Sequence, residues 1–338
     1  MMHDTISLTQ SGSVIPPLRI SILLVPGFSL LSLSSALETM RIANRVCGGK
    51  VFDWSLYSED AAPVVSSLGM PIPVNSEPPE NCRADIAIIC SGVDVEQNGT
   101  PKTLNWLRRA ARQGAMTGGL CTGAYLMAEA GILAGHKATI HWENQASFRE
   151  RFFDVVLVNA PTVIDRARFS TAGGTSSIDL ILLLICDRLG DAQRDNVAAH
   201  MLYTKIHTLQ ENSGISPPDQ LKIKNVKLLK VVRAMEASIE NPVSMRDLAA
   251  LLSISVRQLE RSFHKDIGLS PNRYYSRMRI ERAHQLIVQT ELSITEIGVA
   301  CGFSSNSTFS KKFRETLGVT PHSLRRAAVP KLIMPPPR

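Results

Sequence analysis

The strongest constraint on this chain is a duplication near its C-terminal end. The segment from Ser244 to Pro271 and the segment from Ser293 to Pro321 share a pattern of acidic, apolar, glycine and proline positions. The offset between the copies is 49 residues at the start and 50 from the middle onward. Each copy has the pattern of a short helix, a tight turn and a second helix. A helical unit that occurs twice predicts two binding heads for one partner.

The positive charge of the chain is confined to the part that contains the duplication. Residues 211–338 hold 20 Lys and Arg against 11 Asp and Glu, a net +9, whereas residues 1–210 hold 17 against 19, a net −2. A local excess of cations attracts a polyanion. Because this excess coincides with the repeat, nucleic acid is the predicted partner, and an ordinary solvated surface is the alternative.

In the first copy, the second helix has an outer face of long polar side chains. This helix is predicted from Val256 to Lys265, with Ser255 as its cap and with Leu259 and Phe263 facing inward. The side chains predicted to contact DNA recur at intervals of three and four residues, and they are Arg257, Glu260, Arg261 and His264. A polar helix held by a short turn against another helix is typical of the helix-turn-helix motif.

The second copy repeats this arrangement. Gly302 lies in the predicted turn, Ser305 to Thr316 forms the second helix, and Phe309 and Phe313 face inward. The side chains predicted to contact DNA are Asn306, Ser307, Ser310, Lys311 and Arg314. Arg and Lys suit guanine edges and phosphates, and Asn suits adenine. A long helix from Asn272 to Gln289 is predicted to hold the two heads about one turn of DNA, roughly 34 Å, apart.

The stretch from Leu228 to Arg326 resembles the AraC/XylS family of transcriptional regulators. The most specific matches are Ile254 to Phe263, Arg279 to Ala283 and Ser293 to Phe313, whereas Leu324 stands where the family more often has an aromatic residue. The resemblance implies sequence-specific binding to double-stranded promoter DNA, action on RNA polymerase and assembly as a homodimer. A helical bundle for protein contacts is the alternative.

The N-terminal part alternates short apolar strands with helical patterns, which predicts an α/β fold with a parallel sheet flanked by helices. The predicted strands are residues 18–25, 52–58, 84–90 and 115–120. The predicted helices are residues 32–43, 101–113, 122–130, 177–189 and 191–209, the last two separated by Gly190. A hairpin or edge pair is expected between residues 155–158 and 162–165.

A change of composition separates this part from the helical one. Residues 212–219 read Asn-Ser-Gly-Ile-Ser-Pro-Pro-Asp, and strand patterns vanish after them. The predicted organisation is an α/β domain at 18–210, a linker at 211–221 and an all-α domain with two helix-turn-helix units at 222–328. The proline-rich tail from Pro330 to Arg338 is predicted to fray.

The cysteines and the apolar runs exclude several classes of protein. The six cysteines show no C-x-x-C spacing and no accompanying histidine cluster, so neither a metal site nor a cofactor is predicted. The apolar runs at 20–25 and 178–185 are too short to span a membrane, and the first 17 residues do not form a signal peptide. These features predict a reducing, cytoplasmic compartment.

One cysteine lies in a turn of small residues. Gly119-Leu120-Cys121-Thr122-Gly123 follows a predicted strand and opens a helix, which is the spacing of a nucleophile elbow. A helix N-terminus favours the thiolate, and a strand end downstream presents His141. A thiolate–imidazole pair is one hypothesis for these residues, and a simple packed turn is the other.

Residues 18–208 resemble the class I glutamine-amidotransferase-like, or PfpI-like, fold. The matching segments are residues 25–28, 119–123, 128–135, 138–142 and 171–175. Enzymes of that fold usually carry an acidic residue near the cysteine, in the helix after the first strand, where this chain has Ser32. The resemblance therefore implies a binding domain with no catalytic residues.

A PfpI-like domain followed by two helix-turn-helix units resembles regulators that sense amino acids and small quaternary amines. The implied function is a ligand-responsive transcriptional regulator, an activator of a catabolic operon, that binds a small amino acid or amine and is not an enzyme. The residues predicted to bind this effector are Cys121, Thr122, His141, Trp142, Glu143, Gly173 and Gly174. Core packing of Trp142 and a structural hydrogen bond of His141 are the alternatives at those positions. The alternative function is a cysteine-dependent amidase or hydratase fused to a DNA-targeting module.

Overall fold

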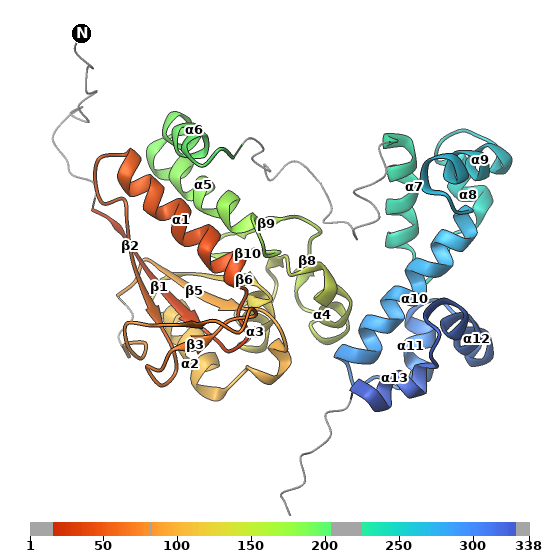
Figure 1. Cartoon of the computed structure of the whole chain (residues 1–338), viewed down its shortest axis with the longest axis horizontal. Helices are drawn as coiled ribbons and strands as arrows, with labels where there is room; N and C mark the ends of the chain where they lie inside the picture. Colours follow the sequence, from red (N-terminus) through yellow and green to blue (C-terminus); the bar gives the residue numbers. More distant parts are fainter. Residues whose placement is uncertain (1–15, 81–82, 204–224, 329–338) are drawn as a thin grey trace, which may run out of the picture. The chain divides into compact units, whose positions relative to one another are not determined.

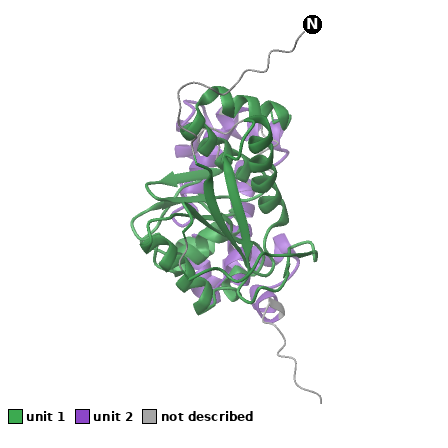
Figure 2. Cartoon of the chain, turned by 90° about the vertical axis from the view of Figure 1, so that its left-hand side faces the viewer, with its two compact units in different colours: residues 1–215 green, residues 216–338 purple. Residues whose placement is uncertain are grey.

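The computed structural model describes residues 16–80, 83–203 and 225–328. The chain divides into two compact units, residues 1–215 and residues 216–338 (Figure 2). The predicted linker at 211–221, the end of the helix predicted at 191–209 and the proline-rich tail lie outside the described residues.

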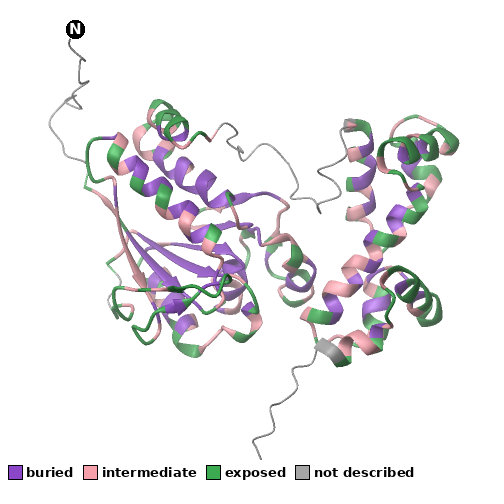
Figure 3. Ribbon diagram, viewed as in Figure 1, coloured by how far each residue is buried: buried purple, intermediate pink, exposed green. Residues whose placement is uncertain are grey.

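The first unit is built on a six-stranded sheet in the order β2-β1-β5-β6-β10-β9. Its strands are β1 (Leu18–Leu24), β2 (Phe52–Tyr57), β5 (Ile86–Ser91), β6 (Met116–Cys121), β9 (Thr162–Asp165) and β10 (Arg168–Thr171). All neighbouring strands run parallel except β9, which is antiparallel to β10. The central strands are buried, and the predicted parallel sheet is confirmed (Figure 3).

Helices cover both faces of this sheet (Figure 1). One face carries α1 (Leu30–Val46), α5 (Ser176–Leu189) and α6 (Asp191–His200), and the other carries α2 (Pro101–Arg112), α3 (Gly123–Glu129) and α4 (Gln145–Arg151). Because side chains alternate along a strand, Ile22 joins the core beneath α1 while Leu23 joins the core beneath α2. Two separate hydrophobic cores therefore hold the sheet.

The hairpin expected between residues 155–158 and 162–165 is wrong. Strand β8 (Val156–Leu157) pairs in parallel with β7 (Lys137–Ala138), and β9 pairs with β10 instead. Only two residues join β9 to β10, and Arg166 turns the chain with a positive φ of 57°. The strand nearest to β9 in sequence, β10, therefore pairs with it.

The remaining short elements of the first unit lie near the ends of the sheet strands. A small antiparallel pair consists of β3 (Val64–Val65) and β4 (Pro71–Ile72). Two single 3₁₀ turns are η1 (Val95–Gln97) and η2 (Trp142–Asn144).

In the described part of the second unit, every regular element is a helix. Its helices are α7 (Val226–Ala237), α8 (Met245–Ala250), α9 (Val256–Ile267), α10 (Pro271–Gln289), α11 (Ile294–Ala300), α12 (Asn306–Leu317) and α13 (Pro321–Ala328). The pair α8–α9 forms a first helix-turn-helix head, the pair α11–α12 forms a second, and α10 connects them (Figure 1). The predicted all-α arrangement with two such units is confirmed.

The duplication extends to the residues that start and end the helices. Ser244 and Ser293 cap α8 and α11, each accepting a hydrogen bond from the backbone three residues on. Gly268 and Gly318 end α9 and α12 with positive φ angles of 80° and 76°. Both copies therefore fold by the same local signals.

Candidate nucleic-acid interface and effector site

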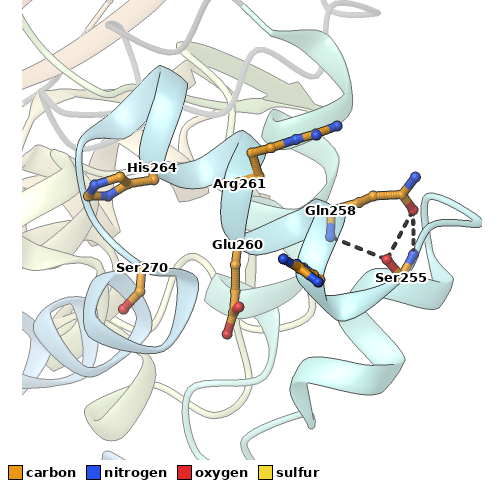
Figure 4. A pocket seen from close by; sticks show the side chains of 7 residues that line it. Ser255, Gln258, Glu260, Arg261, His264 and Ser270 are labelled. Carbon is orange, nitrogen blue, oxygen red and sulfur yellow. Dashed lines mark hydrogen bonds between the residues drawn. The ribbon is translucent and has the colours of Figure 1, made fainter.

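The outer face of α9 carries the polar side chains predicted for the first head. Leu259 and Phe263 are fully buried in the core of this unit, which confirms the predicted inner face. The four residues predicted to contact DNA are exposed: Arg257, Glu260, Arg261 and His264. They line one open hollow on the surface of the head (Figure 4).

Three further residues line this hollow that were not among the predicted contacts: Ser255, Gln258 and Ser270. Ser255 and Gln258 form a capping box, in which the Gln258 N–H donates to Oγ of Ser255 (3.3 Å) and the Ser255 N–H donates to Oε1 of Gln258 (2.8 Å). Ser270 caps α10. In the sequence, polar residues at these positions indicate helix caps. They do not indicate that the caps also line the same surface hollow as the predicted DNA contacts.

In the second head, α12 presents a less charged face. Phe309 and Phe313 are fully buried. Of the predicted contacts, Ser310 is half-buried, and the exposed ones are Asn306, Ser307, Lys311 and Arg314. Asn306 donates from Nδ2 to Oγ1 of Thr295 (2.8 Å), so its side chain already links α12 to α11. The two heads thus offer different surfaces.

In the first unit, Cys121 occupies the turn between β6 and α3. Its φ of 62° is left-handed, an uncommon conformation for a residue with a side chain, and its side chain is 7% exposed. Gly173, before α5, lies against it: a Cβ at Gly173 would stand 2.9 Å from Sγ of Cys121. Only glycine fits there, because its φ of 95° is also left-handed.

Two serines from the start of α1 complete the surroundings of this thiol. Ser32 is fully buried, its Oγ lies 3.0 Å from Oγ of Ser29, and it accepts a hydrogen bond from the Gly174 N–H (2.8 Å). Burial raises the pKa of the Cys121 thiol to about 11, although the Thr122 backbone and the two serine hydroxyls act in the opposite direction. A helix N-terminus favours the thiolate, whereas the burial of Cys121 favours the protonated thiol.

His141 lies next to the turn at Cys121, and Glu143 lies next to His141. The His141 N–H donates to the Cys121 carbonyl oxygen (3.3 Å), and Nδ1 of the ring lies 3.7 Å from Oε2 of Glu143. Burial lowers the pKa of His141, and Glu143 partly offsets this. Within the described ranges, no hydrogen bond joins the His141 ring to Sγ of Cys121. The His141 ring thus lies beside the Glu143 carboxylate.

Trp142 and Thr122 differ in how far their side chains are buried and in whether they already form hydrogen bonds. The Trp142 ring is half-buried, lies 5.9 Å from the His141 ring centroid and belongs to neither described core of this unit. The Thr122 hydroxyl is buried and donates to the Gly92 carbonyl oxygen (2.8 Å). We call the residues gathered here the elbow cluster: Ser29, Ser32, Cys121, Thr122, His141, Trp142, Glu143, Gly173 and Gly174. The sequence does not predict Ser29 as a member of this cluster. It marks Ser32 only as the residue that stands where enzymes of this fold carry an acid.

Two further features of the described residues bear on the kind of site. No group of three His, Cys, Asp or Glu side chains in the described ranges could hold a metal ion. No helix in this part of the chain is long and apolar enough to cross a membrane.

An α/β domain followed in the same chain by two helix-turn-helix heads is the arrangement of a transcriptional regulator. Residues 18–186 match the DJ-1/PfpI family, and residues 248–327 match a helix-turn-helix domain. The chain belongs to the AraC-type helix-turn-helix transcriptional regulators that carry an N-terminal DJ-1/PfpI domain.

Known proteins of this kind match nearly the whole chain. It is 35% identical over 325 residues to the HTH-type transcriptional regulator GbdR of Pseudomonas aeruginosa, which spans 95% of this chain and 89% of GbdR. It is 34% identical over 308 residues to the HTH-type transcriptional regulator CdhR of the same species, 91% of each chain. The crystal structure of an AraC family transcriptional regulator from Pseudomonas putida matches with a TM-score of 0.50 and 27% identity, over 55% of this chain and all of that chain.

Proposed function

We propose that this regulator places α9 and α12 in the major groove of promoter DNA and that the elbow cluster binds a small amino acid or amine that controls a catabolic operon. The observation that carries the proposal is the pair of exposed polar helices at the two ends of α10. Both lie on the same side of α10 in Figure 1, and α7 lies on the other. One duplex can contact both helices only in such an arrangement.

Binding of purified protein to a promoter duplex tests the DNA contacts. Arg257→Ala and Lys311→Ala are each expected to weaken binding by about 1–3 kcal/mol if the side chains contact bases or phosphates. Lys230→Ala is the matched control, because Lys230 is an exposed cation on α7, away from both outer helices. Unchanged affinity in both test variants would refute the groove assignment.

The chemistry of the elbow cluster supports a small zwitterionic or cationic effector. The indole of Trp142 and the exposed carboxylate of Glu143 suit a quaternary ammonium. The N-terminus of α5, which follows Gly173 and Gly174, suits a carboxylate. Together they fit the two ends of a betaine or an amino acid.

Titration calorimetry against a panel of amino acids and betaines tests this part of the proposal. One member of the panel is expected to bind, and Trp142→Ala should abolish the heat of binding. Phe153→Ala is the control, since it removes a ring that is 84% exposed elsewhere in the same unit. No binding by any compound, with promoter binding intact, would contradict the effector assignment.

We also propose that the elbow cluster binds without turnover. Burial favours the protonated form of the thiol, Ser32 stands where enzymes of this fold carry an acid, and the His141 ring lies beside the Glu143 carboxylate. The purified protein and its Cys121→Ala variant are both expected to form no product from any candidate effector. Turnover of a bound effector that this substitution abolishes would favour the amidase or hydratase alternative.

The assembly that acts on transcription is proposed to be a homodimer that recruits RNA polymerase. Paired sites in a promoter match a two-fold symmetric regulator. Light scattering of the purified chain, alone and on its operator, measures the number of copies directly.

A further inference from the structure

The turn of the second head packs directly on the backbone that joins α7 to the first head. A Cβ at Gly302 would lie 2.4 Å from the Ile239 carbonyl oxygen, 2.9 Å from the Glu240 carbonyl oxygen and 2.8 Å from Cγ of Pro242. These three residues follow α7, and Ile239 belongs to the core that supports the first head. Since real Cβ atoms do not approach this closely, only glycine permits the contact.

Arg279 of α10 holds the other side of the same turn. Its Nε donates to the Cys301 carbonyl oxygen (2.7 Å), its Nη2 donates to the Gly302 carbonyl oxygen (2.5 Å), and its guanidinium carbon lies 4.0 Å from the ring centroid of Phe303. A cation beside carbonyl groups that end α11 is favourable, because they have no partner within the helix. The turn is thus fixed to α10 by two charged hydrogen bonds and a stacked ring.

One helical turn earlier, α10 holds the loop of the first head that touches Gly302. The Tyr275 hydroxyl donates to the Ser238 carbonyl oxygen (2.8 Å) and lies 2.7 Å from Oγ of Ser238. Tyr275 and Arg279 are four residues apart and therefore lie on one face of α10. This face of α10 therefore contacts both the residues after α7 and the turn of the second head, and those two segments also contact each other.

The first head lacks this arrangement. The 49-residue offset places Ser253 where the second head has Gly302, and Ser253 is exposed with a positive φ of 55°. The same offset places the exposed Lys230 where the second head has Arg279. The turn of the first head thus forms without the contacts that Arg279 and Gly302 make in the second head, so those contacts serve something other than the motif itself.

We propose that Arg279 and Gly302 are positioning residues that fix the distance and rotation between the two heads, and so determine the spacing of half-sites that the regulator accepts. The inference rests on the proposed binding of both α9 and α12 to one duplex. One base pair of added spacing moves a half-site by about 3.4 Å and rotates it by about 34°. A rigid pair of heads tolerates neither change without distortion of the DNA, which costs free energy.

The test uses the full chain, its operator and a series of duplexes with base pairs added or removed between the half-sites. The protein is expected to prefer one spacing, with about tenfold weaker binding at the neighbouring ones. Arg279→Met keeps the length of the side chain but removes its donors. We expect it to lose about tenfold in affinity at the preferred spacing and to flatten the preference, while affinity for a duplex with only the second half-site stays unchanged.

Controls separate this role from charge and from folding. Arg277→Met removes the same charge from the same helix and should keep the preference of the unaltered protein, because Arg277 is exposed and pairs with Glu281. Tyr275→Phe removes only the hydroxyl that holds Ser238, and it should flatten the preference as Arg279→Met does. Gly302→Ala is not used as the test, because its added carbon would displace backbone atoms and lower the stability of the fold.

The outcomes distinguish the inference from the function on which it rests. If the unaltered protein binds no duplex specifically, the proposed DNA contacts fail. If it binds specifically and Arg279→Met keeps the same spacing preference, the inference alone is overturned. Equal weakening on the single half-site and on every spacing would also overturn it, because Arg279 would then support only the second head.

Discussion

At the scale of single residues, the chemistry of the elbow cluster depends on Ser32. This residue is fully buried at the position where related enzymes carry an acid, and it joins Gly174 to Ser29 through its hydroxyl. A hydroxyl carries no negative charge, so Ser32 cannot act as a general base toward Cys121 as a carboxylate can. The thiol therefore remains buried and neutral, which suits binding rather than catalysis.

Alkylation of Cys121 should be slow at neutral pH and should accelerate as the pH rises toward about 11. The thiolate is the reactive form, and the raised pKa means that burial favours the protonated thiol below that value. Peptide-resolved mass spectrometry with iodoacetamide measures the rate, with a free cysteine peptide in the same solution as the reference. Labelling of Cys121 as fast as the reference near neutral pH would show a reactive thiolate.

At the scale of elements, the two heads begin their helices with related but different caps. Ser293 and Glu296 cap α11, whereas Ser255 and Gln258 cap α9. The hydrogen bonds from Ser293 lower the pKa of Glu296. Gln258 has no titratable group, so only one of the two caps responds to pH.

The first turn of α11 should lose protection against amide exchange in acid, while the first turn of α9 should keep it. Because the pKa of Glu296 is lowered in the fold, its contribution is present above the ordinary value, about 4.3, and is lost as the pH falls through the lowered one. Exchange measured from about pH 6 to about pH 3, corrected for intrinsic rates, shows the difference. Glu296→Gln should make α11 behave like α9, and equal losses in both helices would contradict the assignment.

Most elements were predictable because their signals are local. The strand periods, the caps and the glycines that end α9 and α12 all act over a few residues. The partner of residues 155–158 was not predictable, since β8 pairs with β7 rather than with the adjacent β9. Pairing depends on which edge is free after the whole sheet forms, and the local pattern does not contain that information.

At the scale of the whole molecule, charge and function are divided between the two units. The net +9 of residues 211–338 accompanies the heads, and the net −2 of residues 1–210 accompanies the elbow cluster. A basic head attracts DNA by releasing its counterions, and an acidic domain does not compete for it. This division places the proposed effector site and the DNA-binding heads in units of different charge.

Binding of the full chain to its operator should weaken steeply with salt. If the heads contact six to ten phosphates, affinity should fall about 10³-fold to 10⁵-fold between about 50 mM and about 200 mM salt. Fluorescence anisotropy over a salt series measures the slope, and a fragment of residues 1–210 should show no such binding. A flat slope would mean that the positive charge does not contact the duplex.

The two heads, the α/β order of the first unit and the elbow at Cys121 can be predicted from the sequence, because repeats, periodicity and turn residues are patterns within the chain. Which distant residues come into contact depends on the complete fold. Ser32 and Gly174 lie 142 residues apart along the chain and share a hydrogen bond, and Gly302 packs on Ile239 of the other head. Such contacts arise from the packing of completed elements, and they bring Ser32 and Gly174 to the elbow at Cys121 and join the two heads.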